Sequence, residues 1–331
     1  MKSIIVMQNE AGQRLDKLLA KYLNKAPKSF IYKMLRKKNI TLNGKKAKGN
    51  EITVLHDEIK LYLSDETIEN FSVLHIEKTN VKLNIIYENE HILLINKPCG
   101  MLSQKAKSSD SSLVEHVISY LLETKSVTEE SLRSFKPGIC NRLDRNTSGI
   151  VVAGKSLAGL QDMTEVFRDR RIHKDYLCLV AGIVNSPKLI EGFLEKDERK
   201  NQVTISRQQN HKDALPIKTE YHPLVSRNGV TLLKVKLITG RSHQIRAHLA
   251  SIGHPIIGDS KYGNIQTNAN YRKEFGLKHQ LLHSYRLKMP QMEGALSELS
   301  DQVFLADPPR MFQQIIEKEG LSQWQHGTPE D

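Results

Sequence analysis

The positive charge of this chain is concentrated at its N-terminus, and this asymmetry constrains the domain organisation more than any other feature. Residues 1–64 contain 14 Lys and Arg against 5 Asp and Glu, a net charge of +9. The whole chain of 331 residues has a net charge of +12, so the remaining residues contribute only +3. We therefore expect a small basic module attached to a larger, nearly neutral body.

Composition narrows the class of protein. Hydrophobic residues make up 39% of the chain, which is enough for a sizeable core and excludes general disorder. The basic balance favours a polyanionic partner, either nucleic acid or an anionic membrane surface. The N-terminal apolar run is too short for a signal peptide, and no run approaches the roughly 18 residues that a membrane span needs. Cys99, Cys140 and Cys178 have no Cys-x-x-Cys spacing, which argues against a disulfide framework or a zinc ribbon and favours a reducing cytoplasm.

Two helices and a hairpin are predicted in the basic segment. Apolar residues from Leu15 to Leu23 recur at the spacing of one helix face. Pro27 ends this helix, and Ser29 is the expected cap of a second helix. The Asn-Gly pair at 43–44 lies between β-prone runs and predicts a tight hairpin. The second helix and the hairpin can present six cations to one phosphate backbone: Lys33, Arg36, Lys37, Lys38, Lys45 and Lys46. The alternative is that these side chains are only solvated and have no partner.

Within residues 12–63, RLDKLLAKYL followed by FIYKMLRKKNITLNGKK resembles the alpha-L RNA-binding module. That module is shared by a small-subunit ribosomal protein, tyrosyl-tRNA synthetases and several RNA-modifying enzymes. The resemblance implies that residues 1–64 bind structured RNA and that the six cations lie near phosphates. Residues 65–80 are polar and acidic and are expected to form a linker. The body is expected to span 81–312, followed by a polar tail over 313–331.

The body has the pattern of an α+β fold. Strands are predicted at 85–87, 92–95, 149–154, 176–180 and 229–237, and helices at 113–122, 157–167 and 242–252. In the second of these helices, Leu157, Leu160, Thr164 and Phe167 share one face. Strands outnumber helices and do not alternate regularly with them. This favours a mixed, largely antiparallel sheet over a doubly wound fold.

One segment with candidate catalytic residues is NRLDRNTSGIVVAG at 141–154. Asp144 lies between Arg142 and Arg145 in a polar loop before a buried strand. An oriented carboxylate there can act as a nucleophile or as an electrostatic stabiliser. A local explanation is also open, in which Asp144 and Thr147 cap a turn and Arg142 pairs with Asp144.

The other segment, residues 239–263, contains His243, His248, His254 and Asp259. His243 and His248 are five residues apart and do not share a helical face, so structural hydrogen bonds are favoured over a metal site. Arg246 neighbours an apolar stripe. If Arg246 is buried, its charge requires a carboxylate partner.

Together these segments resemble the RluA/RluC-type pseudouridine synthases, over residues 84 to 310. NRLDRNTSG matches the family signature His-Arg-Leu-Asp-x-x-Thr-Ser-Gly except that Asn141 replaces the usual His. KDYLCLVAG, GRSHQIRAHLASIGHPIIGD, QLLHSYRL and NKPCG resemble the other motifs. The resemblance implies that Asp144 is the catalytic carboxylate, Tyr176 stacks on the target uracil, Arg246 holds Asp144, and Arg142 fills the space left by the flipped base.

The expected activity is therefore isomerisation of specific uridines to pseudouridine in large-subunit (23S) ribosomal RNA, in the cytoplasm, on free RNA or assembling particles. The reaction rearranges one nucleotide without net gain or loss, so no cofactor and no metal is expected. Three alternatives stay open: a ribosome-assembly protein that binds RNA without catalysis, a synthase acting on tRNA or another RNA, and a nucleoside hydrolase or base glycosylase. The last would release free uracil.

Overall fold

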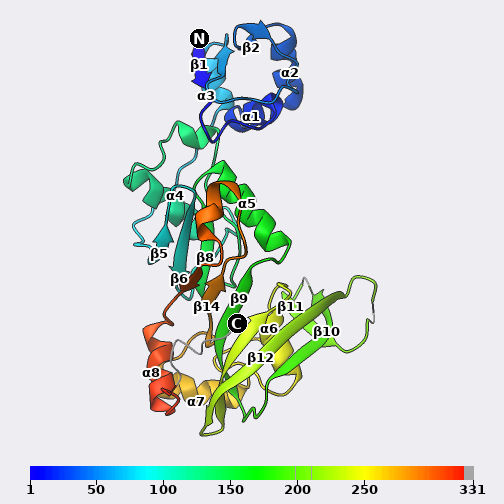
Figure 1. Cartoon of the computed structure of the whole chain (residues 1–331), viewed down its shortest axis with the longest axis vertical. Coiled ribbons are helices and arrows are strands. Elements are labelled where there is room, and N and C mark those ends of the chain that lie inside the picture. The colour runs from blue at the N-terminus through cyan, green and yellow to red at the C-terminus, as the bar shows by residue number, and fades with distance from the viewer. Residues whose placement is uncertain (198, 210, 324–331) are drawn as a thin grey trace.

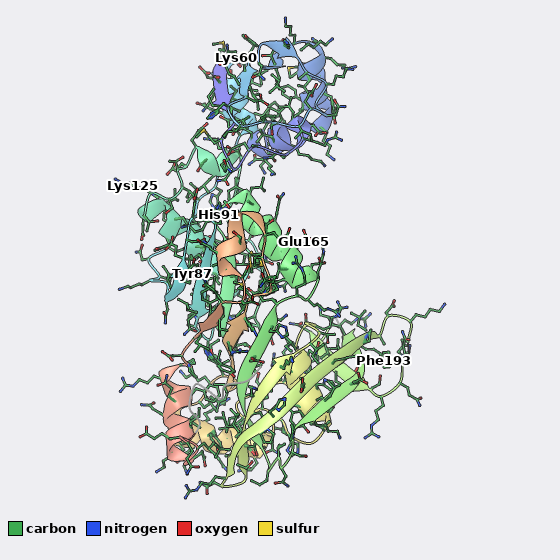
Figure 2. The ribbon with its side chains drawn as sticks, viewed as in Figure 1. Lys60, Tyr87, His91, Lys125, Glu165 and Phe193 are labelled. Carbon is green, nitrogen blue, oxygen red and sulfur yellow. The ribbon has the colours of Figure 1, made fainter. Side chains whose placement is uncertain are left out.

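The structure, a computed structural model, describes residues 1–197, 199–209 and 211–323. The molecule is elongated, with the N-terminal module at one end and a long sheet running through the body (Figure 1). Figure 2 labels Lys60 in the module and Phe193 at the far end of the body, which marks this separation.

The module is a four-stranded antiparallel sheet with helices packed against it. Its strand order is β1-β4-β2-β3. Asn43 and Gly44 have φ values of 51° and 72°, as the predicted hairpin between β2 and β3 requires. The elements are β1 (Lys2–Ile5), α1 (Leu15–Tyr22), α2 (Lys28–Arg36), β2 (Ile40–Leu42), β3 (Lys45–Lys46), β4 (Glu58–Leu61) and α3 (Asp65–Phe71).

Two expectations for the module were wrong. Helix α2 begins at Lys28 with Pro27 as its N-cap, so Ser29 is already inside the helix and caps nothing. Residues 65–71, expected in the linker, form helix α3, whose Ile68 is buried in the module core. The acidic first turn that suggested a linker is instead favourable at a helix N-terminus. The chain has no helix or strand from 72 to 80, so the linker is shorter than expected.

The body contains one large sheet, in the order β11-β10-β12-β13-β9-β14-β8-β6-β5, with β15 beside β14 and β7 beside β8. Among the described strand pairs only β14 and β8 run parallel, which confirms the α+β fold with a mixed, largely antiparallel sheet. The strands are β5 (Ile85–Glu88), β6 (Ile92–Lys97), β7 (Gly138–Ile139), β8 (Ser148–Gly154), β9 (His173–Ala181), β10 (Lys188–Asp197), β11 (Gln202–Ser206), β12 (Leu215–Arg227), β13 (Val230–Leu237), β14 (Leu282–Lys288) and β15 (Val303–Leu305).

Helices cover the sheet at several places along its length (Figure 1). Those of the body are α4 (Leu113–Glu123), η1 (Ser131–Arg133), α5 (Leu157–Arg168), α6 (Gln244–Ser251), α7 (Ile265–Phe275), η2 (Gly294–Leu299) and α8 (Arg310–Lys318). The expected tail therefore starts inside a helix. Phe312, Ile315 and Ile316 of α8 are buried against the body because their spacing forms one apolar helix face within a polar stretch. Residues 324–331 of the expected tail lie outside the described residues.

The module is hydrogen-bonded to the body. The Tyr22 hydroxyl donates to Glu130 at 2.8 Å, and the Ser134 hydroxyl donates to Glu10 at 2.6 Å. These contacts join the module to the segment around η1.

Candidate active site

Asp144 lies in a tight turn between β7 and β8. The Thr147 amide donates to the Asp144 carbonyl at 3.0 Å, which closes the turn. One residue earlier, the Ser103 hydroxyl donates to the Leu143 carbonyl at 2.7 Å, and the Leu143 amide lies 3.1 Å from the same hydroxyl. The loop is therefore fixed on both sides of the carboxylate.

A buried lysine supports the same loop. The Lys97 side chain is fully buried at the end of β6. Its ammonium donates to the carbonyls of Pro98, Met101 and Arg145 at 2.9–3.2 Å. Burial lowers the pKa of Lys97 to about 8, opposed by the charges of Cys99 and Asp144. Lys97 thus ties the opening NKPCG motif to the residue after Asp144.

Asn141, the departure from the family signature, connects the loop to β8. Its side-chain nitrogen donates to the Ile150 carbonyl at 3.2 Å, and its oxygen accepts from the Val152 amide at 2.8 Å. The amide satisfies one backbone donor and one acceptor, so the loop remains anchored with Asn at this position.

Arg246 lies on α6 and binds two carboxylates. Its Nη1 donates to Asp144 Oδ2 at 2.9 Å, which is the ion pair that the family resemblance implied. Its Nε and Nη2 donate to Asp259 at 2.7 Å and 2.9 Å. Burial acts to lower the pKa of Arg246, but the hydrogen bonds and charges of the two aspartates outweigh it and raise the pKa. The Arg246 side chain is only 6% exposed and that of Asp259 is 0% exposed. This buried pair therefore holds the Asp144 carboxylate in position.

Tyr176 on β9 lies beside this network. It is 5% exposed and pairs in register with Ser284 of β14. Burial raises the pKa of Tyr176 to about 12, and the nearby negative charge of Asp144 adds to the shift. Gly149 allows β14 to approach β8 here, because a Cβ at Gly149 would meet the Ser284 carbonyl oxygen at 2.2 Å. The structure thus brings Asp144, Tyr176 and Arg246 together.

Arg142 is separate from this cluster. Its side chain is exposed, and the partner of Asp144 is Arg246. The pairing of Arg142 with Asp144 in the local explanation is therefore wrong, whereas Asp144 and Thr147 do close a turn. Its exposed position leaves Arg142 accessible to a partner.

His243 and Tyr262 complete the surroundings of Asp144 and were given no catalytic role in the sequence analysis. His243 Nε2 lies 4.0 Å from Asp144 Oδ2, and its Nδ1 lies 2.9 Å from the Tyr262 hydroxyl. The guanidinium of Arg246 lies 5.3 Å from the centre of the Tyr262 ring. His248, by contrast, has the expected structural hydrogen bond, with Nδ1 3.0 Å from the Thr219 hydroxyl.

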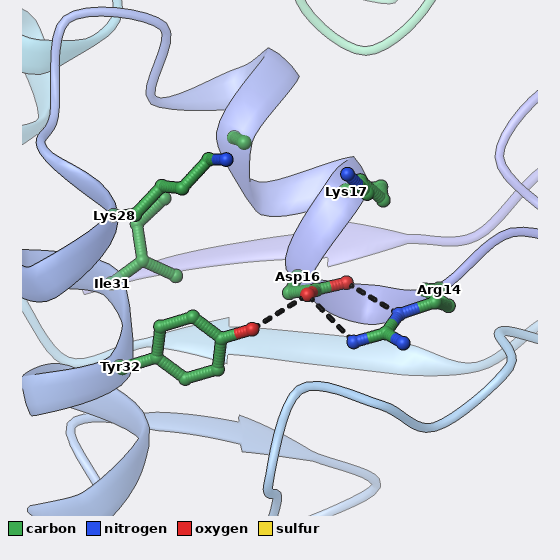
Figure 3. Close-up of a pocket in the computed structure, with 7 residues that line it drawn as sticks. Arg14, Asp16, Lys17, Lys28, Ile31 and Tyr32 are labelled. Atoms are coloured by element: carbon green, nitrogen blue, oxygen red, sulfur yellow. Dashed lines mark hydrogen bonds and ion pairs between the residues drawn. The ribbon is translucent and has the colours of Figure 1, made fainter.

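The module carries a different kind of surface. All six predicted RNA-binding cations are exposed, and none forms an ion pair with another described residue. A cavity of about 270 Å³ lies between α1 and α2, lined by Arg14, Asp16, Lys17, Ala20, Lys28, Ile31 and Tyr32. Figure 3 shows Asp16 held by Arg14 and Tyr32, with Lys17 and Lys28 beside the cavity.

The part of the chain that the structure describes contains no group of three or more His, Cys, Asp or Glu placed to hold a metal ion. No helix in those residues is both long and apolar enough to cross a membrane.

Comparison with known proteins identifies the family. A sequence model described as "RNA pseudouridylate synthase" matches residues 91–251, which include Asp144, Tyr176 and Arg246. The chain is 32% identical over 304 residues to "Ribosomal large subunit pseudouridine synthase C" of Salmonella typhimurium, covering 87% of this chain and 88% of the relative. The chain belongs to the RNA pseudouridylate synthase family. This pseudouridine synthase is an isomerase, and the predicted RluA/RluC-type resemblance is confirmed.

Other comparisons agree with this assignment. The synthase is 30% identical over 293 residues to an uncharacterized RNA pseudouridine synthase of Mycoplasma genitalium, covering 87% of this chain and 89% of the relative. The solved structure titled "Human RNA Pseudouridylate Synthase Domain Containing 4" superimposes with a TM-score of 0.56 at 21% identity, covering 72% of this chain and 93% of the human chain. That likeness confirms the pseudouridine synthase fold.

Proposed function

We propose that this synthase converts specific uridines of large-subunit ribosomal RNA to pseudouridine, with Asp144 as the catalytic carboxylate. The observation that carries the proposal is the mounting of Asp144: its Oδ2 is held by Arg246 at 2.9 Å, and Arg246 is itself held by the buried Asp259. No described residue hydrogen-bonds Asp144 Oδ1, which leaves that oxygen for the substrate.

The reaction breaks the N1–C1′ bond of uridine, turns the detached uracil and joins C5 to C1′. The bonding electrons leave with N1, so the sugar carbon becomes electron-deficient. Asp144 either attacks C1′ as a nucleophile or assists formation of a glycal intermediate. The proton lost from C5 is balanced by the proton gained at N1. A second carboxylate to activate water is unnecessary, because the base and not water rejoins C1′.

The target base must leave the RNA stack before Asp144 can reach its sugar, which costs a few kcal/mol. In the proposal Tyr176 contacts the extruded uracil, and Arg142 enters the RNA helix in its place. The exposure of Arg142 and the proximity of Tyr176 to Asp144 support these roles.

Large-subunit ribosomal RNA is proposed as the substrate for two reasons. Several relatives at 31–32% identity are named ribosomal large subunit pseudouridine synthase C. The chain also presents an exposed cationic surface on the module, suited to a phosphate backbone: Lys33, Arg36, Lys37, Lys38, Lys45 and Lys46. The proposal places the reaction in the cytoplasm, on free or assembling large-subunit RNA, where Cys99, Cys140 and Cys178 would stay reduced as the free thiols they are here.

The test is to map pseudouridines in all ribosomal and transfer RNA from cells that lack this chain. We expect specific large-subunit positions to revert to uridine. The gene for the intact chain should restore them, and the Asp144→Asn variant should not. Loss of pseudouridine from tRNA alone would reassign the substrate, and unchanged maps would refute the proposed function.

A further inference from the structure

We propose that His243 is a further catalytic residue, whose Nε2–H donates a hydrogen bond to a carbonyl oxygen of the uracil while the detached base is negatively charged. The inference rests on the proposed function, since it assigns a role at the same site. It starts from the position of His243 at the start of α6, in left-handed backbone conformation with φ of 55°. That conformation is uncommon for a residue other than glycine.

The hydrogen bonds around Tyr262 favour one tautomer of His243. The Tyr262 oxygen accepts a hydrogen bond from the Val203 amide at 2.8 Å. With this acceptor site of the oxygen occupied, the favoured arrangement has the hydroxyl proton donated to Nδ1 of His243, 2.9 Å away. With Nδ1 accepting, the proton of the neutral imidazole is on Nε2.

Nε2 has no partner in the described protein. The carboxylate oxygen Oδ2 of Asp144 lies 4.0 Å from Nε2, which is too far for a hydrogen bond. The His243 side chain is only 11% exposed. Nε2 is not among the fully buried unpaired polar atoms of the described residues, so it is accessible, and a ligand entering the site can supply the missing acceptor. The donor lies beside the carboxylate that faces the sugar, where the base of a bound uridine must also lie.

Burial favours the neutral form of His243. Burial lowers its pKa, and the positive charges of Arg246 and Lys261 act in the same direction. The negative charges of Asp144 and Asp259 oppose this shift without reversing it. A neutral imidazole leaves Asp144 paired with Arg246 alone, while still offering one N–H to the substrate.

The chemistry creates a need for such a donor. When the N1–C1′ bond breaks, its electron pair delocalises from N1 onto O2 and O4 of the uracil. Three donors of Arg246 are already used by the two aspartates. The Nε2–H of His243 can stabilise the developing oxyanion without giving up its proton, as donors in an oxyanion hole do.

The test combines kinetics with a measurement on the free protein. Tritium release from [5-³H]uridine large-subunit RNA, under single-turnover conditions, should slow about 100-fold in His243→Ala. His243→Gln, which retains an N–H donor, should recover part of the rate. The matched control is His222→Ala, a partly exposed histidine on β12, which should keep the wild-type rate. A His243→Ala rate within threefold of wild type would overturn the inference.

Substrate analogues separate direct contact from a structural role. Replacing O2 or O4 of the target uridine with sulfur weakens the acceptor. One of the two replacements should slow the wild-type enzyme but cause no further loss in His243→Ala. Equal slowing of both enzymes by each analogue would contradict direct contact.

The tautomer is measured independently of turnover, by ¹⁵N NMR of the full chain without RNA. We expect the His243 proton on Nε2 in the wild type and a mixture of tautomers in Tyr262→Phe. A proton on Nδ1 in the wild type would overturn the inference even if rRNA turnover is confirmed. Absence of wild-type turnover on ribosomal RNA, with the proton on Nε2, would instead refute the proposed function.

Discussion

The module and the body each hold an aspartate against an arginine at the same distance, in very different surroundings. Arg14 contacts Asp16 at 2.9 Å in the module, and Arg246 contacts Asp144 at 2.9 Å in the body. The Arg14 side chain is 48% exposed, whereas that of Arg246 is 6% exposed and also bonded to the buried Asp259. A pair whose arginine reaches water, as Arg14 does, contributes little, whereas removing Arg246 leaves the charge of the fully buried Asp259 uncompensated.

This contrast separates two ways of using charge. The module offers exposed cations whose contributions to RNA binding add up and are individually replaceable. The body confines a few charges in fixed positions, where the location of each atom decides the chemistry.

The largest difference is expected between two matched arginine substitutions. Arg246→Met should lower the melting temperature by roughly 10 °C, because it leaves Asp259 buried and unpaired, and should abolish tritium release. Arg14→Met should change the melting temperature by no more than about 2 °C and preserve turnover. Calorimetry and the release assay measure both effects. If Arg246→Met fails to fold, Arg246→Lys should fold and still lose most activity, since it keeps the charge but loses the planar fork. Equal losses of melting temperature and turnover in Arg246→Met and Arg14→Met would contradict the difference proposed between the two ion pairs.

A second substitution tests an exposed charge within the body. Arg142→Ala should reduce the single-turnover rate on structured RNA by about 10- to 100-fold, because the energy that offsets base extrusion is lost. The same variant should lose much less on a target held in a flexible single strand. An equal loss on both substrates would contradict the role of Arg142 in base flipping.

The module should control the salt dependence of binding. Changing Lys33, Lys37 and Lys45 to Gln should reduce the slope of log affinity against log salt by about 2 to 3, since each lost phosphate contact removes a little under one unit. The turnover rate at saturating RNA should not change. A control with equal charge loss replaces the exposed Lys125, Lys212 and Lys273 of the body, the first of which is labelled in Figure 2. An identical slope in both triple variants would show that the module is not the electrostatic contact.

The smallest effect concerns acid stability. Burial lowers the pKa of His248 to about 4, from an ordinary value near 6.5. Between these values the unfolded chain binds a proton that the folded body does not, so the stability from His248 is present above pH 6.5 and falls as the pH is lowered toward 4. The melting temperature should therefore fall less between pH 7 and pH 5 in His248→Gln than in the wild type. The corresponding change at the exposed His56 of the module should leave the wild-type response unaltered. A wild-type slope in His248→Gln would exclude His248 as the cause.

Local signals predicted much of this arrangement. The Asn-Gly pair at 43–44 correctly predicted the hairpin. The position of the charged Arg246 beside an apolar stripe correctly predicted a carboxylate partner. The sequence did not identify Asp259 as the second partner, because the contact depends on a loop that folds back 13 residues later. The role of His243 likewise could not be read from its neighbours in the sequence, because the orientation of its ring depends on the contact with Tyr262, 19 residues later.

Tertiary contacts decided other features that the sequence did not specify. The helix over 157–167 was correctly predicted, but which of its residues are buried, namely Gly159, Met163 and Val166, was not. Gly159 packs so closely that a Cβ there would meet the His91 carbonyl oxygen at 2.2 Å. Helices α3 and α8 were missed because their few apolar residues are set in polar sequence, and their burial is decided by surfaces distant in the chain.

The most direct test of the central claim is single-turnover tritium release by Asp144→Asn at saturating RNA, beside Asp16→Asn in the module as the matched carboxylate. The account predicts a loss on the order of 10⁴-fold or more for Asp144→Asn, with RNA affinity nearly intact, and a near-normal rate for Asp16→Asn. Turnover by Asp144→Asn within tenfold of the wild type would contradict the account, because the buried arrangement would then be holding a carboxylate that the reaction does not use.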